Sequence, residues 1–286
     1  MSASPVSGTA AGVPFTALPP AVPAPAAAPL LVTWHMMDAP RTDAAFAAAL
    51  PLVELPAWRV HLGMPWCGAR EPAEGMSAAI ARTRDNTVLG YLAPVVDQAT
   101  EEFGGALAAL RSRLPLDEGP ISVVGGSLGG AVALNVLAAG DVPVRAAAVI
   151  NAGIRARSVV DLVESATGRR QPVRPAAEEA ADRLDFVARA GDITAGAGGA
   201  PLLVVSGELD YPALRRDAAE LVSALRAHHA RPAAVRLLRV PELAHPLAER
   251  PGVEPAPPLP AARVVGEALT AFFAPLLAAG EEPPHG

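Results

Sequence analysis

The sequence predicts an α/β protein in which a mostly parallel, doubly wound sheet is flanked by helices. Short apolar runs with the length of buried strands alternate with segments whose apolar residues recur every three or four positions. Three of these runs end in loops that carry a serine, an aspartate and a histidine, in that order. Parallel strands end at the same edge of a sheet, so we expect these three loops to lie close together.

The N-terminal part of the chain is rich in alanine and proline. Residues 1–29 contain neither lysine nor arginine, which a secretory signal or a transit peptide would need. We expect them to form a flexible arm that leads into a first strand near Val13–Leu18. Further strands are predicted over 29–34 and 58–62, with a helix over 41–50 between them.

A stripe of apolar residues predicts a long amphipathic helix in the next part of the chain. Its members, spaced three and four apart, are Val96, Ala99, Phe103, Leu107, Leu110 and Leu114. We interpret this stripe as core packing rather than as a cofactor site. Later segments predict a strand over 142–150 and helices over 218–227 and 262–277.

The segment Val123–Gly130 reads VVGGSLGG and leads from a buried strand over 121–124 into an alanine-rich helix over 129–139. Ser127 lies at the centre of a Gly-x-Ser-x-Gly motif. On a tight strand-to-helix turn, side chains at positions 125 and 129 would collide, which explains both glycines. The pattern also occurs in ordinary turns, but the strand before it and the helix after it favour a serine nucleophile. The helix would direct its positive N-terminal end at an oxyanion formed there.

A serine nucleophile needs a base and an acid that orients it. The apolar run 201–205 opens into a turn that carries two carboxylates, Glu208 and Asp210. A third strand over 234–240 breaks at Pro241 and leads to His245, which we take as the base. The histidines at 228 and 229, near a helix end, and at 285, in the tail, are interpreted as surface or packing residues.

With these residues in this order, the chain resembles the α/β-hydrolase superfamily from about Leu30 to about Ala279. The resemblance implies that Ser127 attacks an acyl carbon, that His245 transfers the proton and that Asp210, rather than Glu208, holds the imidazole. It further implies a core formed by 30–152 and 200–280, a cap insertion over 153–199 and a short tail over 281–286.

The resemblance also implies an oxyanion hole built from two backbone N–H groups. One belongs to Leu128, and the other comes from the loop after the early strand, with Met37 the first candidate and Met36 the next. In this chain the loop begins His35-Met36-Met37, where many relatives have His-Gly, so Met36 replaces a glycine. We interpret His35 as holding this loop by hydrogen bonding rather than as transferring a proton.

Substrate choice is expected to depend on the cap and on large side chains near the strand ends. The candidates for lining the pocket are Trp34, His35, Met64 and Trp66, together with the side chains of Met36 and Met37, although such residues are also typical of a core. Helical signals in the cap cover 159–166 and 176–190. Four arginines there, Arg155, Arg157, Arg169 and Arg170, either bind an acidic substrate group or are solvated cap charges.

Composition excludes several classes of function. The formal net charge is −6, and no basic cluster is interleaved with aromatic residues, so we expect no nucleic-acid partner. The single cysteine, Cys67, excludes an intramolecular disulfide, and no residue spacing indicates a metal site or a cofactor. No apolar run indicates a membrane span, and we expect a cytoplasmic protein. The absence of lysine beside abundant arginine, alanine and proline is typical of a bacterial genome rich in G and C.

These observations predict a serine hydrolase that cleaves a small-molecule carboxylic ester through an acyl-enzyme intermediate. A thioesterase or cyclase that transfers an acyl group would use the same residues. A catalytically silent binding protein on the same fold is a third reading, which Met36 keeps open. A peptidase of the prolyl-oligopeptidase kind would need a large gating domain, for which the chain has no room.

Overall fold

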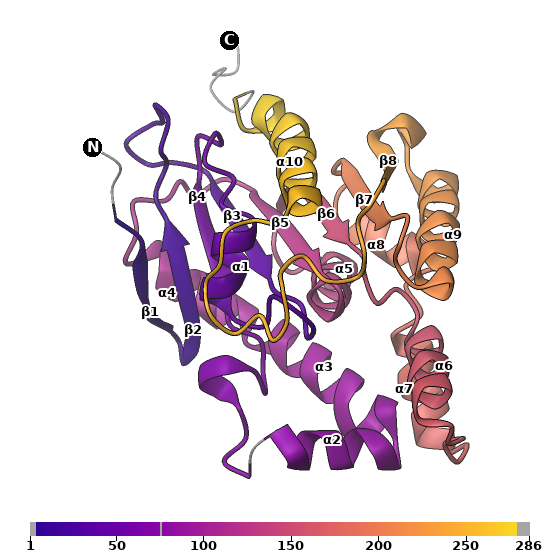
Figure 1. The fold of residues 1–286 in the computed structure, drawn as a ribbon. Helices are drawn as coiled ribbons and strands as arrows, with labels where there is room; N and C mark the ends of the chain where they lie inside the picture. Colours follow the sequence, from indigo (N-terminus) through magenta and orange to yellow (C-terminus); the bar gives the residue numbers. More distant parts are fainter. Residues whose placement is uncertain (1–3, 75, 279–286) are drawn as a thin grey trace.

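A computed structural model describes residues 4–74 and 76–278 of the chain, and in this part it contains one sheet of eight strands (Figure 1). The strands are β1 (Val6–Ala10), β2 (Val13–Leu18), β3 (Leu30–Trp34), β4 (Trp58–Leu62), β5 (Ile121–Gly126), β6 (Val144–Ile150), β7 (Leu202–Gly207) and β8 (Val235–Val240). The α-helices are α1 (Asp43–Ala49), α2 (Met76–Asp85), α3 (Ala93–Glu101), α4 (Phe103–Arg111), α5 (Leu128–Ala139), α6 (Ala156–Thr167), α7 (Pro175–Arg183), α8 (Ala190–Gly196), α9 (Pro212–His228) and α10 (Pro260–Ala278). Short 3₁₀ turns at Gly68–Arg70 and Pro232–Ala234 and a π-helical turn at Val88–Leu92 complete these elements.

The sheet has the predicted mostly parallel, doubly wound topology. Its strand order is β1-β2-β4-β3-β5-β6-β7-β8. The pairs β1–β2 and β2–β4 are antiparallel, and the other neighbouring strands are parallel. Residues of β3, β4, β5 and β7 are buried along their whole length, as expected for parallel strands covered on both faces. The fold class predicted from the sequence is therefore confirmed.

Helices cover both faces of the sheet, and each face has its own hydrophobic core (Figure 1). Residues of α1 and α10 form one core with one face of the central strands. Residues of α3, α4, α5, α8 and α9 form the other core. The carboxyl ends of β5, β7 and β8 consequently emerge between two packed layers, which fixes the loops that carry Ser127, Asp210 and His245.

Two elements differ from the sequence expectations. Residues 6–10, within the segment expected to be a flexible arm, form the edge strand β1, whose side chains are mostly exposed and therefore show no apolar alternation. The turn at Ala11-Gly12 joins β1 to β2 with positive φ angles of 48° and 87°. The long helix expected over 96–114 is interrupted at Glu102, just before Gly104-Gly105, and forms α3 and α4.

The segment expected to be the cap is divided between two layers. Helices α6 and α7 pack with α2 and the π-helical turn in one group at an end of the sheet (Figure 1). Helix α8 instead packs against α5 and α9. A Cβ on Gly196 of α8 would lie 2.1 Å from the Leu137 carbonyl oxygen, so this close approach depends on glycine. The group of α2, the π-helical turn, α6 and α7 is called the cap below.

Helix α10 is long and apolar enough to cross a membrane by length and composition alone. In this structure one of its faces, including Val265, Leu269 and Phe273, is buried in the core beside β6 and β8. A core helix of a protein without membrane spans can have the same length and composition, so these two properties of α10 do not indicate a membrane span.

Candidate active site

Ser127 lies on the sharp turn between β5 and α5, with φ 49° and ψ −117°. This is a strained conformation for a residue with a side chain, and such strain is concentrated at functional sites. A Cβ on Gly125 would lie 2.1 Å from the Gly129 carbonyl oxygen, and a Cβ on Gly129 would lie 2.3 Å from the Trp34 carbonyl oxygen. Both glycines of the motif are therefore required by close backbone approach, as the sequence analysis predicted.

The structure brings together the three residues predicted to act on the substrate. The Ser127 Oγ lies 2.9 Å from His245 Nε2, and His245 Nδ1 lies 2.9 Å from Asp210 Oδ1. Asp210 is buried, and its Oδ1 also accepts a hydrogen bond of 2.7 Å from the Tyr211 N–H. The competing carboxylate, Glu208, is exposed to solvent. A chain of two hydrogen bonds thus links the serine hydroxyl to a buried carboxylate.

Asn151, which the sequence analysis did not identify, holds the loop that carries His245. It directly follows β6, has a positive φ of 46° and is buried. Its Nδ2 donates to the carbonyl oxygens of Ala244 and His245 at 2.8 and 3.1 Å, and its Oδ1 accepts from the Gly207 N–H at 2.8 Å. The sequence signal was a polar residue that tolerates a left-handed conformation, placed directly after a buried strand.

The loop after β3 packs directly against the turn that carries Ser127. His35 is buried, its Nδ1 lies 2.7 Å from the Met36 carbonyl oxygen, and the Met64 N–H donates to its Nε2 at 2.9 Å. These partners require a neutral ring with the proton on Nδ1. Burial lowers the pKa of His35 to about 4, which favours the same neutral form. His35 therefore holds this loop, in agreement with the sequence interpretation.

The two methionines of this loop point to opposite faces of the sheet. Met36 is fully buried in the core formed with α1 and α10, and its Cγ lies 2.9 Å from where a Cβ on Gly126 would be. Met37 is partly buried in the other core, with its Sδ 3.5 Å from the Cys67 Sγ. The side chain of Met36 is consequently accommodated beneath the loop, where Gly126 leaves room for it.

The backbone N–H groups predicted for an oxyanion hole are those of Leu128, Met37 and Met36. Leu128 is the first residue of α5, so its N–H belongs to the unsatisfied first turn of that helix. In the described part of the chain, none of these three N–H groups donates to another residue. They are therefore available for a ligand.

The loop after β8 crosses the loop after β3. Arg250 forms a bidentate ion pair with Asp38, with nitrogen to oxygen distances of 2.9 and 2.6 Å. This hydrogen bonding holds the pKa of the Asp38 carboxyl below its usual range. Three further hydrogen bonds join the loops: Leu247 N–H to the Ala39 carbonyl, Arg41 N–H to the Gly252 carbonyl, and Thr42 Oγ1–H to the Val253 carbonyl. The segments that carry His245 and Met37 are thus tied to each other.

Of the four residues expected to line a substrate pocket, only Trp66 is partly exposed. Trp34 packs edge-on against Phe103 at a centroid distance of 4.9 Å, and Met64 and His35 are also buried. These three side chains therefore lie in the buried interior, where large apolar residues near strand ends are commonly found. Trp66 lies 5.9 Å from the Tyr91 ring and 5.3 Å from the Arg82 guanidinium, at the edge of the cap.

Within residues 4–74 and 76–278, no group of three or more His, Cys, Asp or Glu side chains could hold a metal ion. Cys67 is a buried free thiol, and burial raises its pKa, which disfavours the reactive thiolate.

Comparison with known proteins shows the fold. No protein-family model and no curated protein sequence matches this chain. Among solved structures, TT1662 from Thermus thermophilus is 19% identical, with a TM-score of 0.65 over 99% of this chain and 100% of that one. A puromycin-hydrolysing peptidase from Mycobacterium tuberculosis is 17% identical, with a TM-score of 0.66 over 98% of this chain and 41% of that one. An esterase/lipase from an uncultured bacterium is 15% identical, with a TM-score of 0.54 over 96% and 85%.

Other similar structures carry the names of a serine hydrolase involved in carbazole degradation and a putative lipase from Acinetobacter baumannii. With the strand order and the helical layers described above, these likenesses show that the chain has the α/β-hydrolase fold.

Proposed function

We propose that this chain, which has the α/β-hydrolase fold, is a serine hydrolase that cleaves carboxylic esters through an acyl-Ser127 intermediate. The observation that carries the proposal is the hydrogen-bonded chain from Ser127 Oγ through His245 to the buried Asp210 carboxylate. That arrangement can remove the hydroxyl proton at the moment of attack and hold the imidazolium that forms.

In the first step, Ser127 Oγ attacks the acyl carbon while its proton passes to His245 Nε2. The hydrogen bond from His245 Nδ1–H to Asp210 keeps the ring in the tautomer that leaves Nε2 free to accept this proton. Asp210 stays ionised and stabilises the positive charge on the imidazole. The burial of Asp210 limits competition from water, and the Tyr211 ring packs beside the imidazole, with its centroid 5.5 Å from that of His245.

The N–H groups of Leu128 and Met37 are proposed to stabilise the oxyanion that develops on the substrate. Leu128 adds the dipole of α5, a helix of 12 residues, to its own hydrogen bond. Removal of one such donor typically costs about two to three orders of magnitude in turnover. Turnover should therefore depend strongly on where the loop after β3 places the Met37 N–H.

The attack produces a tetrahedral intermediate that carries the oxyanion. When this tetrahedral intermediate collapses, the proton passes from His245 Nε2 to the leaving alcohol, and the acyl group stays on Ser127. Water then enters and attacks the acyl carbon while it gives a proton to His245. Collapse of the second tetrahedral intermediate returns this proton from His245 to Ser127 Oγ, which releases the acid and restores the hydroxyl. An acyl-transfer enzyme would replace this water with another acceptor, so the two functions differ only in the second half of the reaction.

The test is hydrolysis of a p-nitrophenyl ester series from acetate to decanoate, with an acyl thioester and a p-nitroanilide in parallel. Wild type and Ser127→Ala are compared, and thermal melting establishes that both are folded. We expect ester hydrolysis that is lost in Ser127→Ala. A folded wild-type protein that cleaves the thioester alone would assign it to the acyl-transfer alternative. Turnover of no substrate would favour a silent binding protein.

A further inference from the structure

Most arginines of the cap face a carboxylate, but two do not. Arg157 pairs with Glu178 and Asp182, and Arg174 pairs with Asp85. The other cap arginines with a carboxylate partner are Arg170 with Glu164, Arg82 with Glu74 and Arg183 with Asp97. Within the described part of the chain, Arg84 and Arg169 have no carboxylate within 4.0 Å. Arg155, outside the cap, is engaged by Asp185, Asp217 and Glu220.

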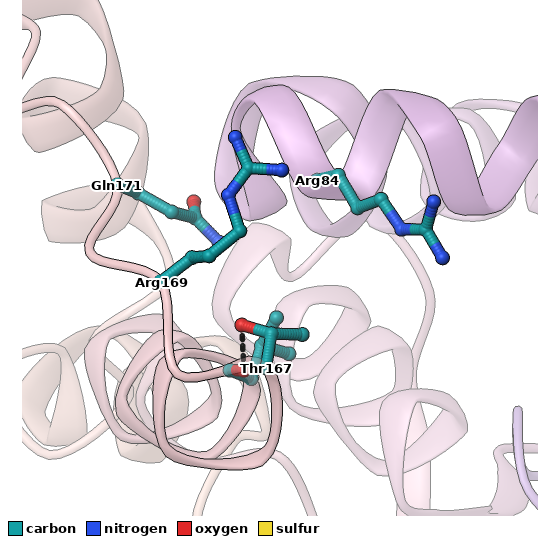
Figure 2. A pocket seen from close by; sticks show the side chains of 5 residues that line it. Arg84, Thr167, Arg169 and Gln171 are labelled. Atoms are coloured by element: carbon teal, nitrogen blue, oxygen red, sulfur yellow. Dashed lines mark hydrogen bonds between the residues drawn. The ribbon is translucent and has the colours of Figure 1, made fainter.

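Arg84 and Arg169 line one cavity of about 290 Å³ between α2 and the link that follows α6 (Figure 2). Figure 2 shows the Arg169 side chain extending from this link toward α2, which carries Arg84. Val163, Thr167 and Gln171 complete the lining, so no carboxylate contributes to it. Gln171 fixes the link, because its side-chain amide is hydrogen bonded to both the backbone N–H and the hydroxyl of Thr87. The cavity therefore combines two cations, a hydroxyl and an apolar wall.

One face of α6 runs from beside the backbone of the Ser127 turn toward this cavity. The Gly153 N–H donates to the Ser127 carbonyl oxygen at 2.9 Å, and a Cβ on Gly153 would lie 3.8 Å from a Val159 methyl group. Val163 and Thr167 follow Val159 at intervals of four residues and so lie on the same face of the helix. Because the helix rises about 1.5 Å per residue, the row from Val159 to Thr167 spans about 12 Å. Two valines and a threonine thus form a row between the backbone of the Ser127 turn and the two arginines.

We infer that the cavity binds the anionic end of an extended substrate: an ester whose acyl chain carries a terminal carboxylate, separated from the ester carbonyl by an apolar spacer along α6. The inference rests on the proposed function, because it places the ester carbonyl at Ser127. The Arg169 guanidinium can donate two hydrogen bonds to a carboxylate, and charge-assisted hydrogen bonds of this kind are strong. Arg84, whose guanidinium extends along α2 away from that of Arg169 in Figure 2, adds positive charge to the site. The apolar spacer would cover Val159 and Val163.

The test uses p-nitrophenyl monoesters of linear dicarboxylic acids, from glutarate to dodecanedioate, and p-nitrophenyl esters of monocarboxylic acids with the same chain lengths. The measured quantity is the ratio of kcat/KM for the acidic ester to kcat/KM for its neutral counterpart. In the wild type we expect this ratio to be highest for the longest acids, whose carboxylate reaches the arginines. In Arg84→Gln/Arg169→Gln we expect the ratio for these acids to fall about tenfold, which corresponds to about 1.4 kcal/mol.

The matched control is Arg157→Gln/Arg174→Gln, which removes the same charge from the same cap at arginines that already face carboxylates. The ratio in this control should equal that of the wild type. An equal fall in both double variants would overturn the inference, because the effect would then be a general one of cap charge. A ratio that does not rise with chain length in the wild type would overturn it as well.

Failure of the proposed function would be separable from failure of this inference. If the wild type hydrolyses no ester, calorimetric binding of dodecanedioate to the wild type and to the two double variants replaces the kinetic ratio. Weaker binding in Arg84→Gln/Arg169→Gln alone would support the anion site. Binding that is absent, or equal in all three proteins, would refute it.

Discussion

At the scale of single residues, the choice between Asp210 and Glu208 decides how His245 is oriented. Only Asp210 contacts the imidazole, and Glu208 is exposed to solvent. We therefore expect Asp210→Asn to lower kcat by about four orders of magnitude, as the equivalent change does in a serine protease, because the amide favours the wrong tautomer. Glu208→Gln is the matched control and should retain nearly full activity. Ester hydrolysis by both variants measures the difference, and a larger loss in Glu208→Gln would reject Asp210 as the acid.

The residues around Ser127 differ in how far the sequence could predict them. Gly125 and Gly129 were predictable from the motif of a tight strand-to-helix turn. A Cβ on Gly125 would meet backbone of the turn itself, whereas a Cβ on Gly129 would meet the loop after β3. Asn151 was not, since its hydrogen bonds reach a loop more than 90 positions later in the chain. Trp34 and Met64, two candidates for the pocket, are buried, and the sequence could not show this for a related reason. A large apolar residue at a strand end looks the same in a sequence whether it faces a pocket or the core.

At the scale of elements, the contact between α5 and the loop after β3 depends on Gly129. A Cβ there would lie 2.3 and 2.5 Å from the carbonyl oxygens of Trp34 and His35, so the loop must shift. We expect Gly129→Ala to lower ester hydrolysis by at least about a hundredfold, because it displaces the Met37 N–H from the oxyanion. Gly104→Ala, at an exposed helical position with open space, should instead raise stability by about 0.5–1 kcal/mol. Kinetics and urea unfolding of both variants test this, and wild-type kinetics in Gly129→Ala would contradict it.

The ion pair between Asp38 and Arg250 joins the loop after β3 to the loop after β8. The proposed mechanism requires these two loops to keep a fixed relative position, because they carry Met37 and His245. Arg250 is exposed and Asp38 is partly buried, so we expect Arg250→Gln to cost no more than about 1 kcal/mol of stability. Its effect on kcat should be larger, between about tenfold and a hundredfold, because small displacements of reacting groups are costly. Exchange of the charges in Asp38→Arg/Arg250→Asp should restore part of the lost kcat.

The control for this prediction is Arg157→Gln, which breaks an exposed ion pair of the cap. It should lower stability by a similar amount and leave kcat for a neutral ester unchanged. Equal kcat values in Arg250→Gln and the wild type would show that the ion pair does not position the two loops.

At the scale of the whole molecule, two buried histidines make stability depend on pH. Burial lowers the pKa of His35 to about 4 and that of His61 to about 3, against an ordinary value of 6.5. As the pH falls below 6.5, the unfolded chain takes up protons that these folded histidines do not bind. The free energy of unfolding should therefore decrease between pH 6.5 and pH 4, by about 1.4 kcal/mol per histidine for each pH unit.

Urea unfolding from about pH 7.5 to about pH 4 measures this dependence. The variant His35→Gln/His61→Gln should show a shallower slope. His228→Gln removes an exposed histidine and should keep the slope of the wild type. A flat profile in the wild type would show that both histidines titrate in the fold as they do in the unfolded chain.

The overall architecture was more predictable than its edges and its cap. Strands such as β3 and β7 are buried along their length, so their apolar runs were a strong local signal. The strand β1 lacks that signal because its side chains are exposed, and its existence depends on pairing with β2. The cap combines α2 with α6 and α7, and only the tertiary contacts bring these distant segments together. Pattern reasoning therefore predicted the layers that bury most apolar surface.

Covalent labelling identifies the residue that acts as the nucleophile, which we propose to be Ser127. The protein is treated with a fluorophosphonate, which reacts with an activated serine, and the labelled peptide is identified by mass spectrometry. We expect one adduct, on Ser127, that forms together with the loss of ester hydrolysis and is absent in the folded His245→Ala variant. An adduct on another serine, or undiminished hydrolysis after full labelling of Ser127, would contradict it.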